Sequence, residues 1–160
     1  MKKLIIRKNF SNADKNYKPN DDYYTPDWIF KTLNLTFDID VCAPEGGVPW
    51  IPANTSYSLK DNGLLQKWHG LIWCNPPFSN PSPWIDKFIA HNNGIMLTQV
   101  SKSRAFIDLW NKAQGIVFPT QNLIKFQHKE LGSRTIFMPV GLFAMGEVSV
   151  KAISKIGHIR

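Results

Sequence analysis

The stretch Gly70-Leu71-Ile72-Trp73-Cys74-Asn75-Pro76-Pro77-Phe78 decides the fold expected for this chain. Its first five residues form a short apolar run opened by a glycine, which predicts a buried strand. The last four place an amide and an aromatic ring at the carboxyl end of that strand. In open α/β sheets, ligands bind outside the carboxyl ends of the strands. The segment therefore predicts a buried strand that leads directly into a binding site.

Residues 75 to 78 also have the chemistry needed to hold an aromatic amine. Such an amine is a poor nucleophile because its lone pair is delocalised, so an enzyme that alkylates it must redirect that lone pair. The Asn75 amide oxygen and the Pro76 carbonyl can both accept hydrogen bonds from one amino group, and the two prolines fix the backbone. Phe78 offers a flat face for stacking a base that has left its duplex. The alternative interpretation is an ordinary proline turn after a strand.

The rest of the chain alternates between helical and strand patterns. Helices are expected over 26–33, with Thr25 as N-cap, and over 82–91 and 103–113. Strands are expected over 37–41, 70–74, 94–100 and 116–118, and a long loop over 44–61. Residues 134–144 predict a strand pair or one bulged strand, because Pro139 and Gly141 interrupt them. This alternation predicts an α/β fold with a mostly parallel, Rossmann-like sheet.

Composition favours one globular domain over residues 23–160, preceded by a polar arm over 1–22. The chain is 43% hydrophobic and contains six tryptophans, which is typical of a globular protein. Leu4-Ile5-Ile6 is too short for a signal-peptide core and no apolar run is long enough to cross a bilayer, so a cytoplasmic protein without a membrane partner is expected. Cys42 and Cys74 have neither paired spacing nor a neighbouring His/Cys cluster, so no metal site is expected.

The positive charge lies at the two ends of the chain. Residues 1–20 carry six basic and one acidic side chain, and residues 121–160 carry six basic and two acidic, whereas the residues between them are net negative. Lys and Arg contacts to phosphates supply most of the sequence-independent affinity for nucleic acid, so a polyanionic partner is expected. The alternative is a charged, solvated tail.

Several segments together resemble a known family. They are Tyr24-Thr25-Pro26-Asp27, Phe37-Asp38-Ile39-Asp40-Val41-Cys42-Ala43, Asp61-Asn62-Gly63-Leu64, Trp68 and Asn75-Pro76-Pro77-Phe78. In this order they are similar to the small phage-type DNA N6-adenine methyltransferases of the Dam family, which use S-adenosylmethionine. The resemblance implies a pared-down class I methyltransferase fold whose last strand is antiparallel, and a cytoplasmic enzyme of the host cell if a bacteriophage encodes it.

The resemblance also implies a cofactor site at the first strand. This chain lacks the usual Gly-x-Gly turn there and carries acidic residues instead, which suit the ammonium, sulfonium and hydroxyl groups of the cofactor. Asp40 is the preferred ligand, since Asp38 could face solvent by strand alternation. Asp61 could equally form a turn. The expected cofactor-binding residues are Thr25, Pro26, Asp38, Asp40, Cys42, Ala43, Asp61, Gly63 and Leu64.

The reaction implied by the resemblance is direct methyl transfer to N6 of an adenine flipped out of double-stranded DNA, with Asn75, Pro76, Pro77 and Phe78 as catalytic residues. The residues expected to contact DNA are Lys2, Lys3, Arg7, Lys8, Lys102, Arg104, Lys125 and Arg134. Two alternatives stay open on the sequence. One is a methyltransferase acting on an RNA base or a protein amide, and the other is a non-catalytic DNA-binding protein that keeps the fold.

Deleting residues 1–10 is expected to lower DNA affinity about equally for all sequences. Phosphate contacts position a protein without reading bases, so target specificity and the rate at saturating DNA should survive. Each lost phosphate contact should remove roughly 0.9 from the slope of log affinity against log salt. Binding titrations at several salt concentrations measure this slope. Unchanged DNA affinity would make the arm a solvated tail, and an altered target sequence would mean that it enters a groove.

Overall fold

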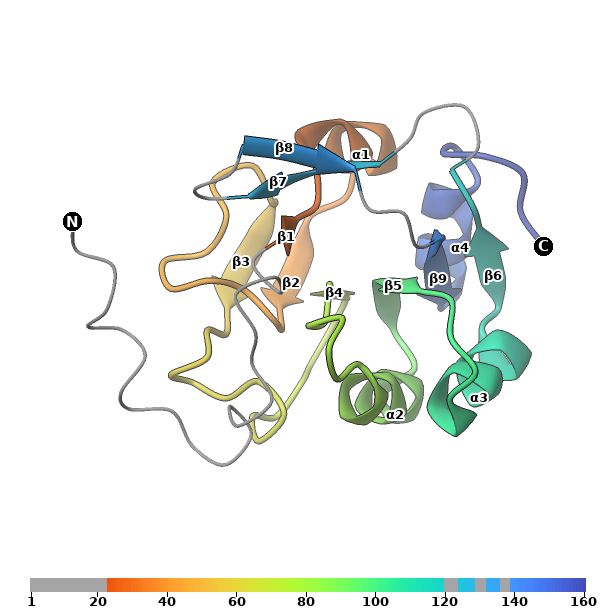
Figure 1. Cartoon of the computed structure of the whole chain (residues 1–160), viewed down its shortest axis with the longest axis horizontal. Helices are drawn as coiled ribbons and strands as arrows, with labels where there is room; N and C mark the ends of the chain where they lie inside the picture. Colours follow the sequence, from red (N-terminus) through yellow and green to blue (C-terminus); the bar gives the residue numbers. More distant parts are fainter. Residues whose placement is uncertain (1–22, 120–123, 129–131, 136–138) are drawn as a thin grey trace.

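The main sheet of the protein has six strands in the order β3-β2-β4-β5-β9-β6 (Figure 1). The computed structural model describes residues 23–119, 124–128, 132–135 and 139–160. The strands are β2 (Phe37–Asp40), β3 (Ala53–Ser56), β4 (Ile72–Cys74), β5 (Gly94–Gln99), β6 (Gly115–Val117) and β9 (Val140–Met145). Strands β3, β2, β4 and β5 are parallel, and β9 is antiparallel to both β5 and β6. The predicted mostly parallel sheet with an antiparallel last strand is confirmed.

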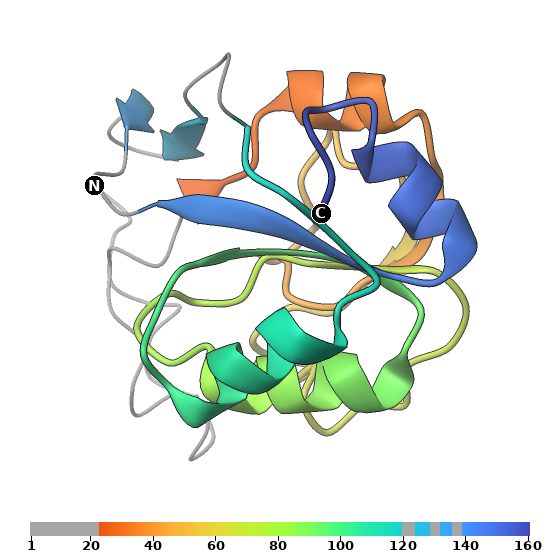
Figure 2. The same cartoon turned by 90° about the vertical axis from the view of Figure 1, so that its right-hand side faces the viewer.

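Helices cover both faces of this sheet and give three layers (Figure 2). They are α1 (Asp27–Leu33), α2 (Ser82–His91), α3 (Arg104–Lys112) and α4 (Glu147–Ile153). Phe88 of α2 and Leu109 of α3 are fully buried in the core on one face. Leu33 of α1 and Ile153 of α4 are fully buried in the core on the other. Because both faces are covered, β4 is apolar throughout and β5 is apolar up to Leu97.

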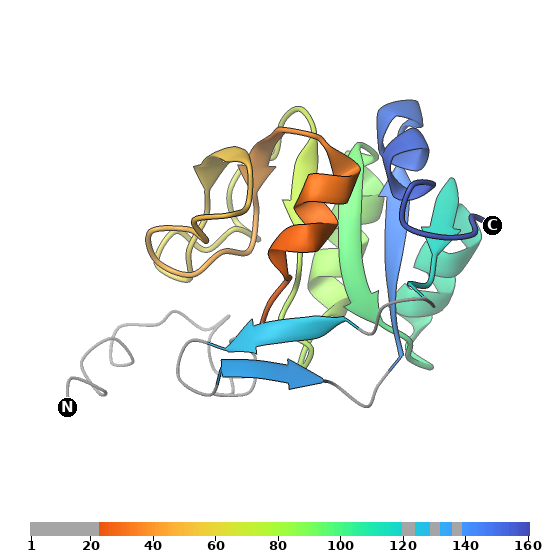
Figure 3. The same ribbon diagram turned by 90° about the horizontal axis from the view of Figure 1, so that it is seen from above.

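A second, smaller sheet lies at the end of the main sheet towards which β5 points (Figure 3). Its antiparallel strands are β1 (Tyr23–Tyr24), β7 (Lys125–His128) and β8 (Gly132–Thr135), in the order β1-β7-β8. The ring of Phe126 on β7 packs edge-on against two other rings. Its centroid lies 6.3 Å from the ring centroid of Tyr23 and 5.8 Å from that of Phe78, which follows β4. This small sheet therefore borders the carboxyl ends of the parallel strands.

Some elements differ from the sequence prediction. Strand β3 lies within the predicted loop 44–61, and its central residues are exposed and polar because it is the sheet edge. The predicted strand pair over 134–144 is wrong, since β8 and β9 belong to different sheets. Helix α4, only seven residues long, was not expected.

The start of α1 also differs from the prediction. The N-cap is Pro26 and not Thr25, and the cap makes no side-chain hydrogen bond. Instead, Thr25 is fully buried and its hydroxyl has no hydrogen-bond partner. Of the helices in the described ranges, none is long and apolar enough to cross a membrane.

Gly70→Ala is expected to destabilise the fold more than Gly46→Ala. Both glycines have positive φ, 64° and 82°, so both variants carry backbone strain. A Cβ at Gly70 would lie 2.0 Å from Asp38 Oδ2, whereas one at Gly46 would meet no atom within 4 Å. The Gly70 variant should therefore lose about 1–3 kcal/mol more in free energy of unfolding, measured by urea denaturation. Equal losses would show that the Asp38 carboxylate moves aside without cost.

Candidate active site

A cavity of about 280 Å³ opens beside the carboxyl ends of β2 and β4. Its walls come from the segment before α1, the residues after β2 and β4, and the loop over 57–64. The sequence-predicted residues that line it are Thr25, Asp40, Cys42, Ala43, Gly63, Leu64, Asn75 and Pro77. Its volume is near the lower end of the roughly 300–1,000 Å³ typical of small-molecule sites. The structure thus brings together residues that are up to 52 positions apart in the chain.

Asn75 follows β4 and has its amide group fixed by the small sheet. Its Nδ2 donates a hydrogen bond of 2.9 Å to the backbone carbonyl of Tyr23 on β1. A carbonyl can only accept, so the nitrogen of the amide must face Tyr23, which leaves Oδ1 as the acceptor on the other side. Asn75 therefore presents a hydrogen-bond acceptor that is oriented before any substrate arrives.

Phe78 is held from two directions beside the cavity. Its backbone carbonyl accepts a hydrogen bond of 2.9 Å from Gln99 Nε2, at the end of β5. Its half-buried ring meets Phe126 at an interplanar angle of 88°. Phe78 is not among the residues that line the cavity, and Pro76, which is buried, is not among them either. The predicted catalytic segment thus borders the cavity at one end.

Asp40 is a buried carboxyl group at the end of β2, with 3% of its surface exposed. Burial raises its pKa from 3.8 to about 7, and a hydrogen bond of 3.3 Å from the backbone N–H of Cys42 only partly opposes this. Trp73, its register partner on β4, and Thr25 each have a buried polar atom without a hydrogen-bond partner. Unsatisfied buried groups are uncommon in native proteins, and two of the four found among the described residues belong to residues that line the cavity.

Two comparisons with known proteins identify the family. Residues 11–140 match the family described as "DNA N-6-adenine-methyltransferase (Dam)". The DNA N-6-adenine-methyltransferase of Haemophilus phage HP1 (strain HP1c1) is 33% identical over 143 residues, covering 82% of this chain and 78% of that protein. The chain belongs to the Dam family. It is an adenine-specific DNA methyltransferase that uses S-adenosylmethionine, and the alternatives of an RNA or protein substrate and of a non-catalytic protein are set aside.

The residues at the cavity of this Dam-family enzyme fit the cofactor. S-Adenosylmethionine presents an ammonium, hydroxyl groups and an aromatic base. The Asp40 carboxyl and the orphaned Thr25 hydroxyl can bond polar groups, while Ala43, Val48 and Leu64 form an apolar wall. The cavity also lies at the carboxyl ends of parallel strands, where ligands bind in open α/β sheets. The individual cofactor contacts stay predictions.

Asp38 occupies a different place from Asp40. Its Oδ2 accepts a hydrogen bond of 2.7 Å from the N–H of Leu71, and its own N–H donates one of 2.7 Å to the Leu71 carbonyl. These bonds tie β2 to the start of β4, and Asp38 does not line the cavity. Of the two acidic residues on β2 that the sequence offered, only Asp40 lines the cavity.

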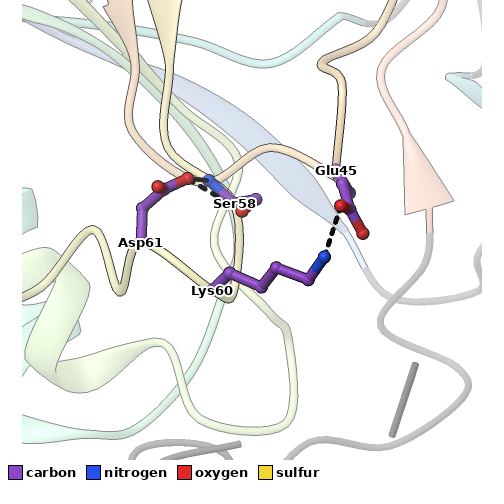
Figure 4. Close-up of polar contacts among 4 residues, drawn as sticks. All are labelled: Glu45, Ser58, Lys60 and Asp61. Atoms are coloured by element: carbon purple, nitrogen blue, oxygen red, sulfur yellow. Dashed lines mark hydrogen bonds and ion pairs between the residues drawn. The ribbon is translucent and has the colours of Figure 1, made fainter. Parts of the chain in front are cut away.

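Asp61 closes a turn at the rim of the cavity (Figure 4). Its carboxylate accepts hydrogen bonds from the Ser58 N–H at 2.7 Å and the Ser58 hydroxyl at 2.8 Å, which lower its pKa. The neighbouring Lys60 pairs with Glu45 of the opposite loop. Asp61 is exposed and does not line the cavity, although Gly63 and Leu64 do. The hydrogen bonds of Asp61 are those expected of a turn-forming residue. Pro26, which is buried at the start of α1, does not line the cavity either.

The predicted DNA-contacting residues fall in three groups. Lys102 and Arg104 follow β5 and are exposed, and Arg104 pairs with Asp108 at 3.2 Å. Lys125 is exposed on β7, and Arg134 lies on β8. Lys2, Lys3, Arg7 and Lys8 lie outside the described residues. The first two groups lie on elements near the carboxyl edge that also carries Asn75.

Two residues that hold the predicted catalytic segment were missed in the sequence. Tyr23, whose carbonyl orients Asn75, and Gln99, which holds Phe78, were not singled out from the sequence. A two-residue strand carries no periodic signal, but a polar residue ending the apolar β5 could have pointed to Gln99.

Cys74 is fully buried, and burial raises the pKa of its thiol well above the usual range, so it stays neutral. Within the described ranges, no group of three His, Cys, Asp or Glu residues could hold a metal ion.

Asp40→Asn is expected to flatten the pH dependence of stability. The folded-state pKa is raised from 3.8 to about 7, so folding favours the protonated carboxyl. The free energy of unfolding of the wild type should therefore fall as the pH rises from 3.8 to about 7. The asparagine variant lacks this titration. Urea denaturation across that range measures it, with exposed Asp86→Asn as the control, and a wild-type slope retained in Asp40→Asn would contradict the assignment.

Proposed function

We propose that this Dam-family enzyme methylates an adenine that has been flipped out of double-stranded DNA, with Asn75 to Phe78 holding the base. The N6 amino group would donate its two hydrogens to Asn75 Oδ1 and to the Pro76 carbonyl. The observation that carries this proposal is the hydrogen bond between Asn75 Nδ2 and the Tyr23 carbonyl, which leaves Oδ1 available as an acceptor. Accepting both hydrogens turns the nitrogen lone pair away from the ring and towards an incoming methyl group.

Stacking of the flipped base is assigned to Phe78. Its backbone is tied to Gln99 and one edge of the site is closed by Phe126, so the ring has a defined position. Base stacking on an aromatic side chain contributes roughly 1–3 kcal/mol. Because Phe78 borders the cavity and does not line it, the base and the cofactor would approach from different sides of Asn75.

The cavity residues are assigned to the cofactor, with Asp40 as its main polar partner. When bound, S-adenosylmethionine supplies the electrophilic methyl group of its sulfonium. Asp40 can balance a positive charge or accept a hydrogen bond from a hydroxyl when it is ionised, and with its pKa raised to about 7 both the protonated and the ionised forms are populated near neutral pH. Gly63 and Leu64 also line this cavity.

Positioning carries most of the proposed rate enhancement. None of the four predicted catalytic residues is a base at neutral pH, and the neutral, buried Cys74 is not available as a nucleophile. The chain therefore contributes by holding two reactants in line and by placing hydrogen-bond acceptors where the amine needs them. No covalent bond to the enzyme is required.

The basic side chains near the carboxyl edge are assigned to the DNA backbone. Lys102 and Arg104 after β5 and Lys125 on β7 are exposed, on elements that adjoin the end of β4. Contacts of this kind add affinity without reading sequence. Together with the basic arm over 1–22, they would hold the duplex while one base enters the site.

Asn75→Ala is expected to lower the methylation rate by roughly 100-fold or more, because it removes an oriented hydrogen-bond acceptor. Asn75→Asp should retain more activity than Asn75→Ala, since it keeps an acceptor oxygen and loses only the donor to Tyr23. Exposed Asn54→Ala on β3 is the control. Nucleoside mass spectrometry after incubation with unmethylated DNA and S-adenosylmethionine measures N6-methyladenine. Near wild-type activity in Asn75→Ala, with an unchanged melting temperature, would overturn the assignment.

A further inference from the structure

Lys87 on α2 holds the backbone of the loop that forms one wall of the cavity. Its ammonium donates hydrogen bonds to the carbonyl oxygens of Leu64 at 2.7 Å, Gly63 at 3.4 Å and Gln66. An ammonium has three N–H donors, so one side chain matches three backbone acceptors within residues 63–66. Gly63 and Leu64 line the cavity, whereas Lys87 does not.

An aromatic cluster encloses the same ammonium. Lys87 Nζ lies 4.9 Å from the centroid of Trp68, within the range of a cation–π interaction. Trp68 Nε1 donates a hydrogen bond of 2.8 Å to the Gly63 carbonyl, which is one of the acceptors that Lys87 uses. Trp68 also stacks on Trp84, with ring centroids 6.4 Å apart. The loop is thus fixed by two donors that come from different parts of the chain.

The positive charge of Lys87 is stabilised by three backbone carbonyl groups and by the ring of Trp68. In the described part of the chain, no carboxylate pairs with Lys87. Partial burial lowers the pKa of its ammonium, which is the expected direction when a cation loses water without gaining an anion. An ammonium placed in this way without a salt bridge needs its three carbonyl partners, and the carbonyls need it in return.

The position of the loop is tightly constrained on the cavity side. A Cβ at Gly63 would lie 2.1 Å from the Val41 carbonyl and 3.2 Å from the Trp84 ring. Val41 directly follows β2, the strand that ends at Asp40. The loop therefore packs against the end of β2, next to the buried carboxyl group at the cavity, and Lys87 supports it from the side of α2.

We infer that Lys87 is a positioning residue for S-adenosylmethionine, because its ammonium fixes the Gly63–Leu64 wall against which the adenosine part of the cofactor binds. This inference rests on the proposed assignment of the cavity to the cofactor. Lys87 touches neither the cofactor nor the DNA in this arrangement. Its effect should appear in cofactor affinity and not in the rate at saturating cofactor.

The test compares Lys87→Met with Lys67→Met, which removes the charge of an exposed lysine in the same loop region. Calorimetry with S-adenosylhomocysteine and with methylthioadenosine should show Kd raised roughly tenfold or more for both ligands in Lys87→Met, the size expected when a hydrogen-bonded charge is lost. The rate at saturating cofactor and the KM for DNA should stay within about twofold of wild type, a change below roughly 0.5 kcal/mol. Lys67→Met should bind both ligands like wild type.

Hydrogen exchange provides a readout that needs no ligand. The backbone amides of residues 62–66 should exchange faster in Lys87→Met than in wild type, while those of β5 should not change. If Lys87→Met does not fold, Lys87→Arg replaces it. A planar guanidinium cannot direct three donors to converging carbonyls as an ammonium does, so weaker binding of both ligands is again expected.

Different outcomes separate this inference from the proposed function. Wild-type Kd values in folded Lys87→Met or Lys87→Arg would overturn the role of Lys87, even if the melting temperature falls. Weaker binding of S-adenosylhomocysteine with unchanged binding of methylthioadenosine would also overturn it, because the loop would then serve the methionine part. If Asp40→Ala binds both ligands as tightly as wild type, the ligands do not occupy this cavity. That result would overturn the assignment of the cavity to the cofactor.

Discussion

The hydrogen bond from Asn75 Nδ2 to the Tyr23 carbonyl joins the two sheets of this enzyme. Asn75 follows a central strand of the main sheet, and Tyr23 belongs to a two-residue strand that pairs with β7. So short a strand has little stability alone, so its pairing with β7 and the contact between Tyr23 and Phe126 hold it in place. The orientation of the predicted catalytic amide thus depends on Tyr23, which is itself held by β7 residues about 100 positions after Tyr23 in the chain.

Three buried residues with polar side chains line the cavity. Thr25 and Trp73 each bury a polar atom that has no hydrogen-bond partner among the described residues, and Asp40 buries a carboxyl group that accepts a hydrogen bond from the Cys42 N–H. Burying a polar group without a partner costs free energy. That cost is offset by the apolar cores on both faces of the sheet. A ligand that bonds these groups recovers part of it on binding, which is why such groups are more often found in binding sites than elsewhere.

The sequence predicted the central strands, α1, α2 and α3 because their apolar residues follow clear periods. It failed at β1, β3, β7 and α4, which are two, four, four and seven residues long and have little pattern of their own. The same limit applies to the site. Asn75 to Phe78 and Asp40 stand at strand ends and were proposed for that reason, and Asn75, Pro77 and Asp40 line the cavity. Asp38 and Asp61, proposed beside them, bond backbone N–H groups and do not line it. Only the register of the strands separates Asp38 from Asp40.

Support from behind the cavity explains why a small domain can hold a polar ligand without the Gly-x-Gly turn. A glycine-rich turn lets the backbone approach a ligand closely at one point. Here the equivalent freedom is at Gly63, where the Val41 carbonyl and the Trp84 ring leave no room for a Cβ. A loop so close to a strand end needs partners for its own carbonyls, and Lys87 and Trp68 provide them. The Gly63–Leu64 part of the cavity wall is therefore held by hydrogen bonds from Lys87 and Trp68, beside the residues that follow β2.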